Sequence, residues 1–176
     1  MRIIGGELKG RRFSPPSNLQ ARPTTDMAKE SLFDILNNRL DFESISVLDM
    51  FGGTGSISLE FASRGCKSIV AIEKNSINHG FILRTLRDFG IESVNLIKGD
   101  SFKFITSTGA KFDLIFADPP YDDPKLPQIP DLIFEHGLLK PDGILILEHS
   151  KRNKFNEHPH FDEHRNYGQV NFSFFK

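Results

Sequence analysis

The sequence predicts an α/β fold: a doubly wound, mostly parallel seven-stranded sheet with helices on both faces and a β-hairpin extension at the N-terminus. Short apolar segments alternate with helical segments over most of the chain. The apolar segments are continuous Ile, Leu and Val runs, which are typical of parallel strands buried on both faces. Strand–helix–strand repetition also implies right-handed crossovers and therefore one doubly wound sheet.

The individual elements follow from the apolar runs and from the helical spacing of apolar residues. Residues 1–13 predict the hairpin, residues 14–23 predict a linker, and a helix is expected from there to about Asn37. Strands are expected at 46–49, 69–72, 94–97, 112–117 and 143–147, with two more within 161–175 on either side of Tyr167-Gly168. Helices are expected up to Ser63, at 76–89 and at 130–137, and the helix at 76–89 is expected to bury Ile77, Phe81, Leu83 and Leu86.

Length and composition bound the organisation of the chain. A chain of 176 residues is long enough for one sizeable core and too short for two ordinary domains. We expect a single domain over 1–176, with a basic hairpin and linker at 1–22 and the core at 23–176. The single cysteine, Cys66, excludes an intrachain disulfide and fits a reducing compartment. Because neither a signal peptide nor a membrane-spanning run is visible, we expect a cytoplasmic monomer without a membrane partner.

Four acidic residues follow the ends of the first four expected strands: Asp49, Glu73, Asp100 and Asp118. In doubly wound sheets, ligands bind at the carboxyl ends of the strands. One acid at a strand end is unremarkable, but four in consecutive units converge on one crevice. The sequence therefore predicts a ligand site at this edge of the sheet.

A glycine loop, VLDMFGGTG, joins the first of these strands to a helix. Gly53 and Gly55 allow unusual backbone angles and a close approach of a ligand. The dinucleotide pattern G-x-G-x-x-G fails at its third position, which is Ser58. Asp49 would also repel a pyrophosphate, whereas it suits a ligand with a positive charge. S-adenosylmethionine carries an ammonium and a sulfonium and no phosphate, so we favour it over a dinucleotide.

The next two strand-end acids suit the rest of such a cofactor. Glu73 follows the glycines by about 20 residues and can accept hydrogen bonds from both ribose hydroxyls. Asp100 can accept a hydrogen bond from an adenine amino group. It can equally cap the helix expected at 101–107, and the two roles are compatible.

The tetrapeptide Asp118-Pro119-Pro120-Tyr121 is the most specific signal in the chain. Its two prolines fix two φ angles and remove two backbone donors, so the loop is rigid and its carbonyls can accept hydrogen bonds. Asp118 and the Pro119 carbonyl can together accept both hydrogens of an –NH2 group, while Tyr121 lies against a planar ring. Such positioning would aim the lone pair of a poorly nucleophilic exocyclic amine at a methyl group.

The head of the chain is basic although the net charge is −1. Its cations are Arg2, Lys9, Arg11, Arg12 and Arg22, against the single acid Glu7. A local basic patch can contact nucleic-acid phosphates. The alternative interpretation is a solvated hairpin whose cations guard an edge strand.

Together these segments resemble the RsmD family within the class I S-adenosylmethionine-dependent methyltransferases. The head segments MRIIGGELKGRRF and RPTTDMAKESLFDIL, and the later EFASRG and LEHS, carry the resemblance alongside the glycine loop and DPPY. It spans nearly the whole chain. It implies methyl transfer from S-adenosylmethionine, with S-adenosylhomocysteine as product, to the N2 amino group of a guanine at 16S ribosomal RNA position 966. The implied partner is that RNA or the small ribosomal subunit.

The resemblance also implies roles for individual residues. Cofactor binding falls to Asp49, Phe51, Gly53, Gly55, Glu73, Lys74, Asp100 and Ser101; the target amine to Asp118, Pro119, Pro120 and Tyr121; and RNA to Arg2, Lys9, Arg11, Arg12, Arg22, Thr24 and Thr25. Two features depart from the family. It commonly has Ala-Gly-Ser-Gly at 52–55, and often an Asn near Arg84 or Thr85.

Several alternatives remain open. The same motifs suit methylation of adenine N6 or of a protein glutamine, and less well a nicotinamide-dependent oxidoreductase or a non-catalytic RNA-binding factor. The histidines His158, His160 and His164 cluster in a polar region without a cysteine nearby, so we expect a surface role and no metal site. Cys66 is expected to be a small buried residue.

Overall fold

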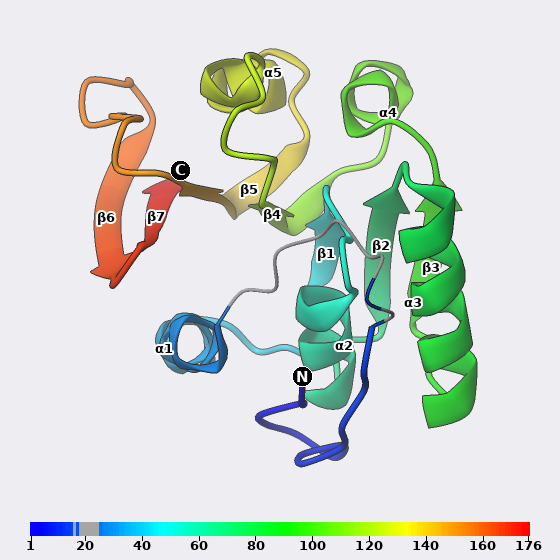
Figure 1. The fold of residues 1–176 in the computed structure, drawn as a ribbon. Helices are drawn as coiled ribbons and strands as arrows, with labels where there is room; N and C mark the ends of the chain where they lie inside the picture. Colours follow the sequence, from blue (N-terminus) through cyan, green and yellow to red (C-terminus); the bar gives the residue numbers. More distant parts are fainter. Residues whose placement is uncertain (16, 18–24) are drawn as a thin grey trace.

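The computed structural model describes residues 1–15, 17 and 25–176, and within them seven strands form one sheet (Figure 1). The strands are β1 (Ser46–Asp49), β2 (Ser68–Glu73), β3 (Val94–Lys98), β4 (Phe112–Ala117), β5 (Leu139–His149), β6 (Phe161–Tyr167) and β7 (Val170–Phe175). The helices are α1 (Asp26–Asn37), α2 (Ser56–Ser63), α3 (Ser76–Phe89), α4 (Ser101–Ser107) and α5 (Ile129–Glu135), preceded by a 3-10 turn η1 (Leu126–Gln128).

The sheet has the order β3-β2-β1-β4-β5-β7-β6. The first five of these neighbours are mutually parallel, and only the pairings of β7 with β5 and with β6 are antiparallel. The predicted fold class is therefore confirmed. The parallel alignment brings the carboxyl ends of β1 to β5 to the same edge of the sheet.

Helices cover both faces of the sheet, with α1, α2 and α3 on one face and α4 and α5 on the other (Figure 1). Alternate residues of each strand enter the two resulting cores, as Val47 and Leu48 of β1 show. In α3 the buried face differs from the prediction. Ile77 and Leu83 are exposed and Ile82 is fully buried, because the packing of the helix on β2 and β3 decides which apolar residues face inward.

The N-terminal segment turns back on itself as predicted, but it forms a single antiparallel bridge, Arg2 to Arg12, instead of regular strands. The Ile3 amide donates to the Arg11 carbonyl at 2.9 Å. Ile3 and Phe13 are buried in the same core as α1, α2 and α3. At the turn, Gly6 has φ +73°, and a Cβ there would lie 1.8 Å from the Ser63 carbonyl oxygen. Only glycine lets the segment approach α2 this closely.

A buried carboxylate, Glu60 of α2, anchors this segment. It accepts hydrogen bonds from the backbone amides of Ile4 (3.0 Å) and Gly5 (2.7 Å), and it pairs with Lys29 of α1 (3.4 Å). Lys29 Nζ also donates to the Arg2 carbonyl (2.7 Å) and to Ser56 Oγ (3.0 Å). Burial lowers the pKa of Lys29, opposed by the Glu60 carboxylate. The head of the chain, α1 and α2 are therefore joined through one buried ion pair.

Three smaller expectations concern residues outside the site. Cys66 is buried, as predicted. His158 contacts Asp131 at 3.1 Å and His160 stacks on Phe134, so these two histidines have surface partners. In the described part of the chain no helix is long and apolar enough to cross a membrane.

We expect the Glu60→Gln variant to lose about 3 kcal/mol of unfolding free energy, because removing one partner of a buried pair leaves Lys29 uncompensated. Equilibrium unfolding in urea measures this loss. Glu43→Gln is the matched control, since Glu43 forms an exposed pair with Lys67 and should cost less than about 1 kcal/mol. Equal losses in the two variants would contradict the anchoring role of Glu60.

Candidate active site

A cavity of about 1220 Å³ lies at the carboxyl edge of the sheet. Its walls come from the glycine loop after β1, the ends of β2 and β5, the DPPY loop after β4, the first turns of α1, α3 and α4, and the turn between β6 and β7. Of the predicted site residues, it brings together Thr25, Phe51, Gly53, Glu73, Lys74, Asp100, Ser101, Asp118, Pro119, Pro120 and Tyr121. Predicted cofactor and target residues thus line one continuous space.

Glu73 fixes the position of the glycine loop through a hydrogen bond with its backbone. The Gly53 amide donates to Glu73 Oε2 at 2.7 Å, and the Asn75 amide donates to Oε1 at 2.6 Å. Gly55 has φ +79°, and a Cβ there would lie 3.1 Å from Ile82 Cγ1. The loop therefore needs glycine both for its backbone angle and for the close approach of α3. Each Glu73 oxygen keeps a second acceptor lone pair for a ligand hydroxyl.

Asp49 lies beneath the loop and does not line the cavity. It is 1% exposed, and Ser58 Oγ donates to its Oδ2 at 2.6 Å. Ser58 thus replaces the third glycine of a dinucleotide motif with a group that holds Asp49. No donor reaches Oδ1 with hydrogen-bond geometry in the described residues. Burial raises the pKa of Asp49 to about 6, opposed mainly by the Ser58 hydrogen bond.

Asp100 fulfils its predicted capping role. Its Oδ1 accepts from the amides of Phe102 (3.0 Å) and Lys103 (3.2 Å), and its Oδ2 accepts from Lys74 Nζ (2.9 Å). The hydrogen bond from Lys74 lowers the pKa of Asp100. Ser101 Oγ donates to the Met50 carbonyl and ties α4 to the glycine loop.

Aromatic rings line the same end of the cavity. Phe51 and Phe102 meet edge to face with centroids 6.0 Å apart. They offer an apolar surface suited to a planar ring next to the acceptor Asp100.

The DPPY loop leaves β4 beside the end of β5. Tyr121 donates its hydroxyl to Glu148 Oε1 at 2.8 Å, and this hydrogen bond fixes the direction of the tyrosine ring. Glu148 is 4% exposed and lines the cavity. Glu148 is an acid at the end of the fifth strand, so it carries the same sequence signal as the four strand-end acids named above. The sequence analysis nevertheless assigned it no role.

Asn78 is a second residue that sequence reasoning missed. It lies in the first turn of α3, is 6% exposed and lines the cavity, and its Oδ1 accepts no hydrogen bond in the described residues. A buried acceptor of this kind fits a ligand donor. Its signal was its place in the first turn of a helix that follows a strand-end acid. The turn at 167–170 also reaches the cavity, although nothing in its sequence marked it.

The predicted RNA-binding residues are only partly described. Arg22 and Thr24 lie outside the described residues. Thr25 caps α1 by accepting from the Ala28 amide at 3.2 Å and lines the cavity.

The other predicted RNA contacts do not line the cavity. Arg2 pairs with Asp26 at 3.0 Å, and Arg11 lies over the Phe89 ring at 5.2 Å. Lys9 and Arg12 are exposed. The turn of this segment contacts Ser63 through the Leu8 amide, at the end of α2 farther from the glycine loop (Figure 1). Because α2 has eight residues, Ser63 lies roughly 12 Å from the end of the helix that adjoins the glycine loop.

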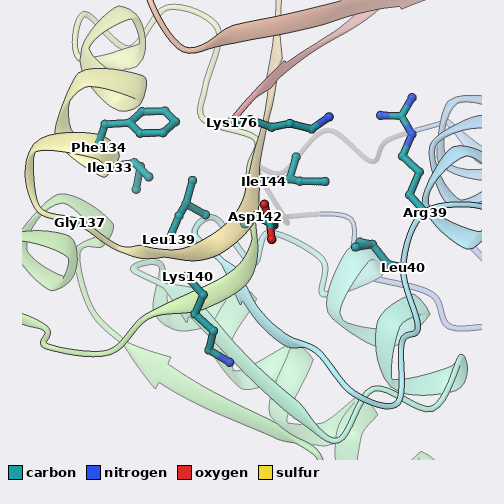
Figure 2. Close-up of a pocket in the computed structure, with 11 residues that line it drawn as sticks. Arg39, Leu40, Ile133, Phe134, Gly137, Leu139, Lys140, Asp142, Ile144 and Lys176 are labelled. Carbon is teal, nitrogen blue, oxygen red and sulfur yellow. The ribbon is translucent and has the colours of Figure 1, made fainter.

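A second cavity of about 750 Å³ lies beside the start of β5 and contains none of the predicted site residues (Figure 2). Its cations Arg39, Lys140 and Lys176 each have a carboxylate partner, at 2.5, 2.8 and 2.8 Å. Paired cations of this kind stabilise the fold and leave no group poised for chemistry. Among the described residues, no group of three or more His, Cys, Asp or Glu side chains could hold a metal ion.

The fold and the site define a class I, Rossmann-like methyltransferase: a doubly wound sheet with a glycine loop after β1, an acid after β2 and DPPY after β4. The family described as "Conserved hypothetical protein 95" matches residues 1–176. The chain therefore belongs to this family, the RsmD family of methyltransferases.

Individual relatives agree with this assignment. The chain is 29% identical over 155 residues to the putative rRNA methyltransferase YlbH of Bacillus subtilis, covering 86% of this chain and 83% of the relative. It is 27% identical over 153 residues to ribosomal RNA small subunit methyltransferase D of Escherichia coli K12, covering 87% and 76%. A solved structure, that of the hypothetical protein TTHA0928 from Thermus thermophilus, superposes with a TM-score of 0.88 at 26% identity and covers 100% and 99%.

The raised pKa of Asp49 predicts a pH-dependent stability. Because the folded-state pKa of about 6 exceeds the unfolded value near 3.9, the folded protein holds this proton more tightly. Stability is therefore lost as pH rises through the window from about 4 to 6, and the loss amounts to about 2–3 kcal/mol. Asp49→Asn mimics the protonated acid, so we expect it to escape that loss.

Urea unfolding of wild type and Asp49→Asn between pH 4 and 7.5 tests this. The difference in unfolding free energy should grow in favour of the variant as pH rises, and should level off above about pH 6.5. Asp34→Asn, which removes an exposed carboxylate on α1, should show no such growth. A difference that is constant with pH would show that Asp49 titrates normally.

Proposed function

We propose that this protein transfers a methyl group from S-adenosylmethionine to the exocyclic N2 amino group of a guanine in 16S ribosomal RNA. The observation that carries the proposal is the shared cavity: the rigid DPPY loop faces the same space as the glycine loop and Glu73. The names of the relatives, which specify rRNA and in one case the small subunit, support RNA as the substrate.

The residues present fit S-adenosylmethionine. Asn78 Oδ1 is a buried acceptor that no donor among the described residues reaches, which suits the ammonium group of the methionine part. Ionised Asp49 adds negative charge beneath the loop. Glu73 would accept the ribose hydroxyls, and the Phe51 and Phe102 rings would contact the adenine near Asp100. The Lys74–Asp100 pair would lie at the adenine end of the site.

The bound cofactor supplies an electrophilic methyl group on a sulfonium. The protein's part is to position the amine. Asp118 and the Pro119 carbonyl accept its two hydrogens, which favours a tetrahedral nitrogen and aims the lone pair along the line of attack. Tyr121, fixed by Glu148, lies against the face of the base. After transfer the nitrogen is strongly acidic, and its proton passes to Asp118 or to water.

The target guanine must be unpaired or flipped out to enter the cavity. We propose that residues 1–22 form a basic extension of the catalytic core at 23–176. Lys9, Arg11 and Arg12 would then contact phosphates outside the cavity, since none of the three lines it. Thr25 would lie at the rim that the target crosses.

Asp118→Ala should bind S-adenosylhomocysteine within about threefold of wild type in calorimetry. Its methyl transfer should fall by about 10²–10³-fold, because it loses an acceptor that acts on the amine. Transfer is measured with tritiated cofactor on 16S rRNA and on 30S particles, with mapping of the modified base. Asp131→Ala, an exposed residue that does not line the cavity, is the control for both measurements.

Mass analysis of the product separates the alternatives. N2-methylguanosine supports the proposal, whereas N6-methyladenosine or a methylated glutamine overturns its substrate. An Asp118→Ala variant that transfers methyl groups at the wild-type rate would contradict the mechanism. If the protein bound neither S-adenosylmethionine nor S-adenosylhomocysteine, methyl transfer from this cofactor would be excluded.

The double variant Lys9→Ala/Arg12→Ala should bind RNA more weakly and with a shallower salt dependence. Two lost phosphate contacts lower the slope of log K against log salt by about 1.5. Filter binding across a salt series measures the slope. The control Lys103→Ala/Lys111→Ala removes the same charge from the α4 side of the sheet and should leave the slope unchanged. Equal slopes in the two variants would exclude an RNA-contacting role for the head segment.

A further inference from the structure

Asp118 directly follows β4, and Glu148 lies near the end of the neighbouring strand β5. β4 and β5 pair in register with Phe116 opposite Ile146 and Ala117 opposite Leu147. The next position in this register sets Asp118 opposite Glu148, on strands separated by roughly 4.8 Å. Both residues line the cavity.

Extending the strand alternation by one residue assigns both carboxylates to the same face of the sheet. Phe116 and Ile146 enter the core on the α1–α3 face, whereas Ala117 and Leu147 enter the core on the α4–α5 face. Because side chains alternate between the faces, the residues that follow return to the α1–α3 face. The cross-strand pairing of Glu148 with Phe172, a residue of that same core, agrees with this assignment.

The two neighbouring carboxylates of Asp118 and Glu148 match the hydrogen-bond donors of guanine better than those of the other bases. The Watson–Crick edge of guanine presents two adjacent donors, N1–H and the N2 amino group. Adenine presents its amino group beside an N1 that is an acceptor. If Asp118 holds the amino group, the neighbouring acceptor meets a hydrogen on guanine and a lone pair on adenine. A carboxylate facing a lone pair loses a hydrogen bond and adds repulsion.

We propose that Glu148 determines the base specificity of the site by accepting a hydrogen bond from guanine N1–H while Asp118 and Pro119 hold the N2 amine. This inference rests on the proposed function. The place of Glu148 on β5, paired with β7 and 4% exposed, orients its carboxylate, which also accepts from Tyr121 at 2.8 Å. A carboxylate accepts up to about four hydrogen bonds, so Glu148 serves the tyrosine and the base together. Its burial makes an unmatched partner costly, which is the basis of discrimination.

The test compares two targets that carry the same 2-amino group. Guanine at the mapped target nucleotide is replaced by 2-aminopurine, whose N1 is an acceptor, in whichever substrate supports turnover, rRNA or reconstituted 30S particles. Wild type should prefer guanine by about 10²-fold or more in kcat/KM. Glu148→Gln should reduce this preference at least tenfold, because the Gln amide can donate to N1 of 2-aminopurine and can still accept from Tyr121.

Tyr121→Phe is the matched control. It removes the hydroxyl that contacts Glu148 and leaves the carboxylate, so both rates should fall together with the preference kept within about threefold. If Glu148 served only to orient Tyr121, Glu148→Gln would also lower both rates in parallel. The ratio of two substrates is independent of the folded fraction of each preparation, so a poorly folding variant still yields a result.

The possible outcomes distinguish a failure of the role of Glu148 from a failure of the proposed function. An unchanged preference in Glu148→Gln, with wild type still forming N2-methylguanosine, overturns the role of Glu148 and leaves the proposed function standing. Wild type that methylates both targets equally well has the same consequence. No N2-methylguanosine from wild type on any RNA overturns the proposed function itself, and the specificity role with it.

Discussion

Five neighbouring strands run in the same direction, and their shared register places every candidate catalytic group. The carboxyl ends of β1 to β5 meet at one edge of the sheet. Side chains at these strand ends and in the loops that follow them line the cavity. Register matters as much as direction, because a slip of one residue turns each side chain to the opposite face. The pairing of Ala117 with Leu147 therefore brings the residues that follow, Asp118 and Glu148, to the wall of one cavity.

Within that frame, the site divides into a cofactor half and a target half. Glu73, Asn78 and the glycine loop shape the first, whose buried acceptors suit the polar, positively charged cofactor of the proposed function. The DPPY loop and Glu148 shape the second, where acceptors predominate. This separation suits a direct transfer between two bound molecules, because the protein orients both reactants and forms no bond to either.

Buried charged residues hold the helices and the glycine loop around the cavity in place. The Lys29–Glu60 pair joins the head of the chain to α1 and α2, and Lys29 also donates to Ser56, which follows the glycine loop directly. Asp49, held by Ser58, occupies the space beneath the same loop. Such groups are costly to desolvate, and they are retained where several hydrogen bonds compensate for the loss of water. The head segment is consequently packed into the core, although its cations face solvent.

The sequence by itself determined the order of strands and helices, the glycine loop, the strand-end acids and the DPPY loop, because these signals are local: apolar runs, glycines and prolines act on their own stretch of chain. Only the tertiary structure decided that Ile82 and not Ile77 or Leu83 is buried, and that Glu60 pairs with Lys29. It also decided that Glu148 and Asp118 line the same cavity and that Lys9 and Arg12 do not line it. These facts depend on how helices pack and how strands align, and those contacts join residues far apart in the chain.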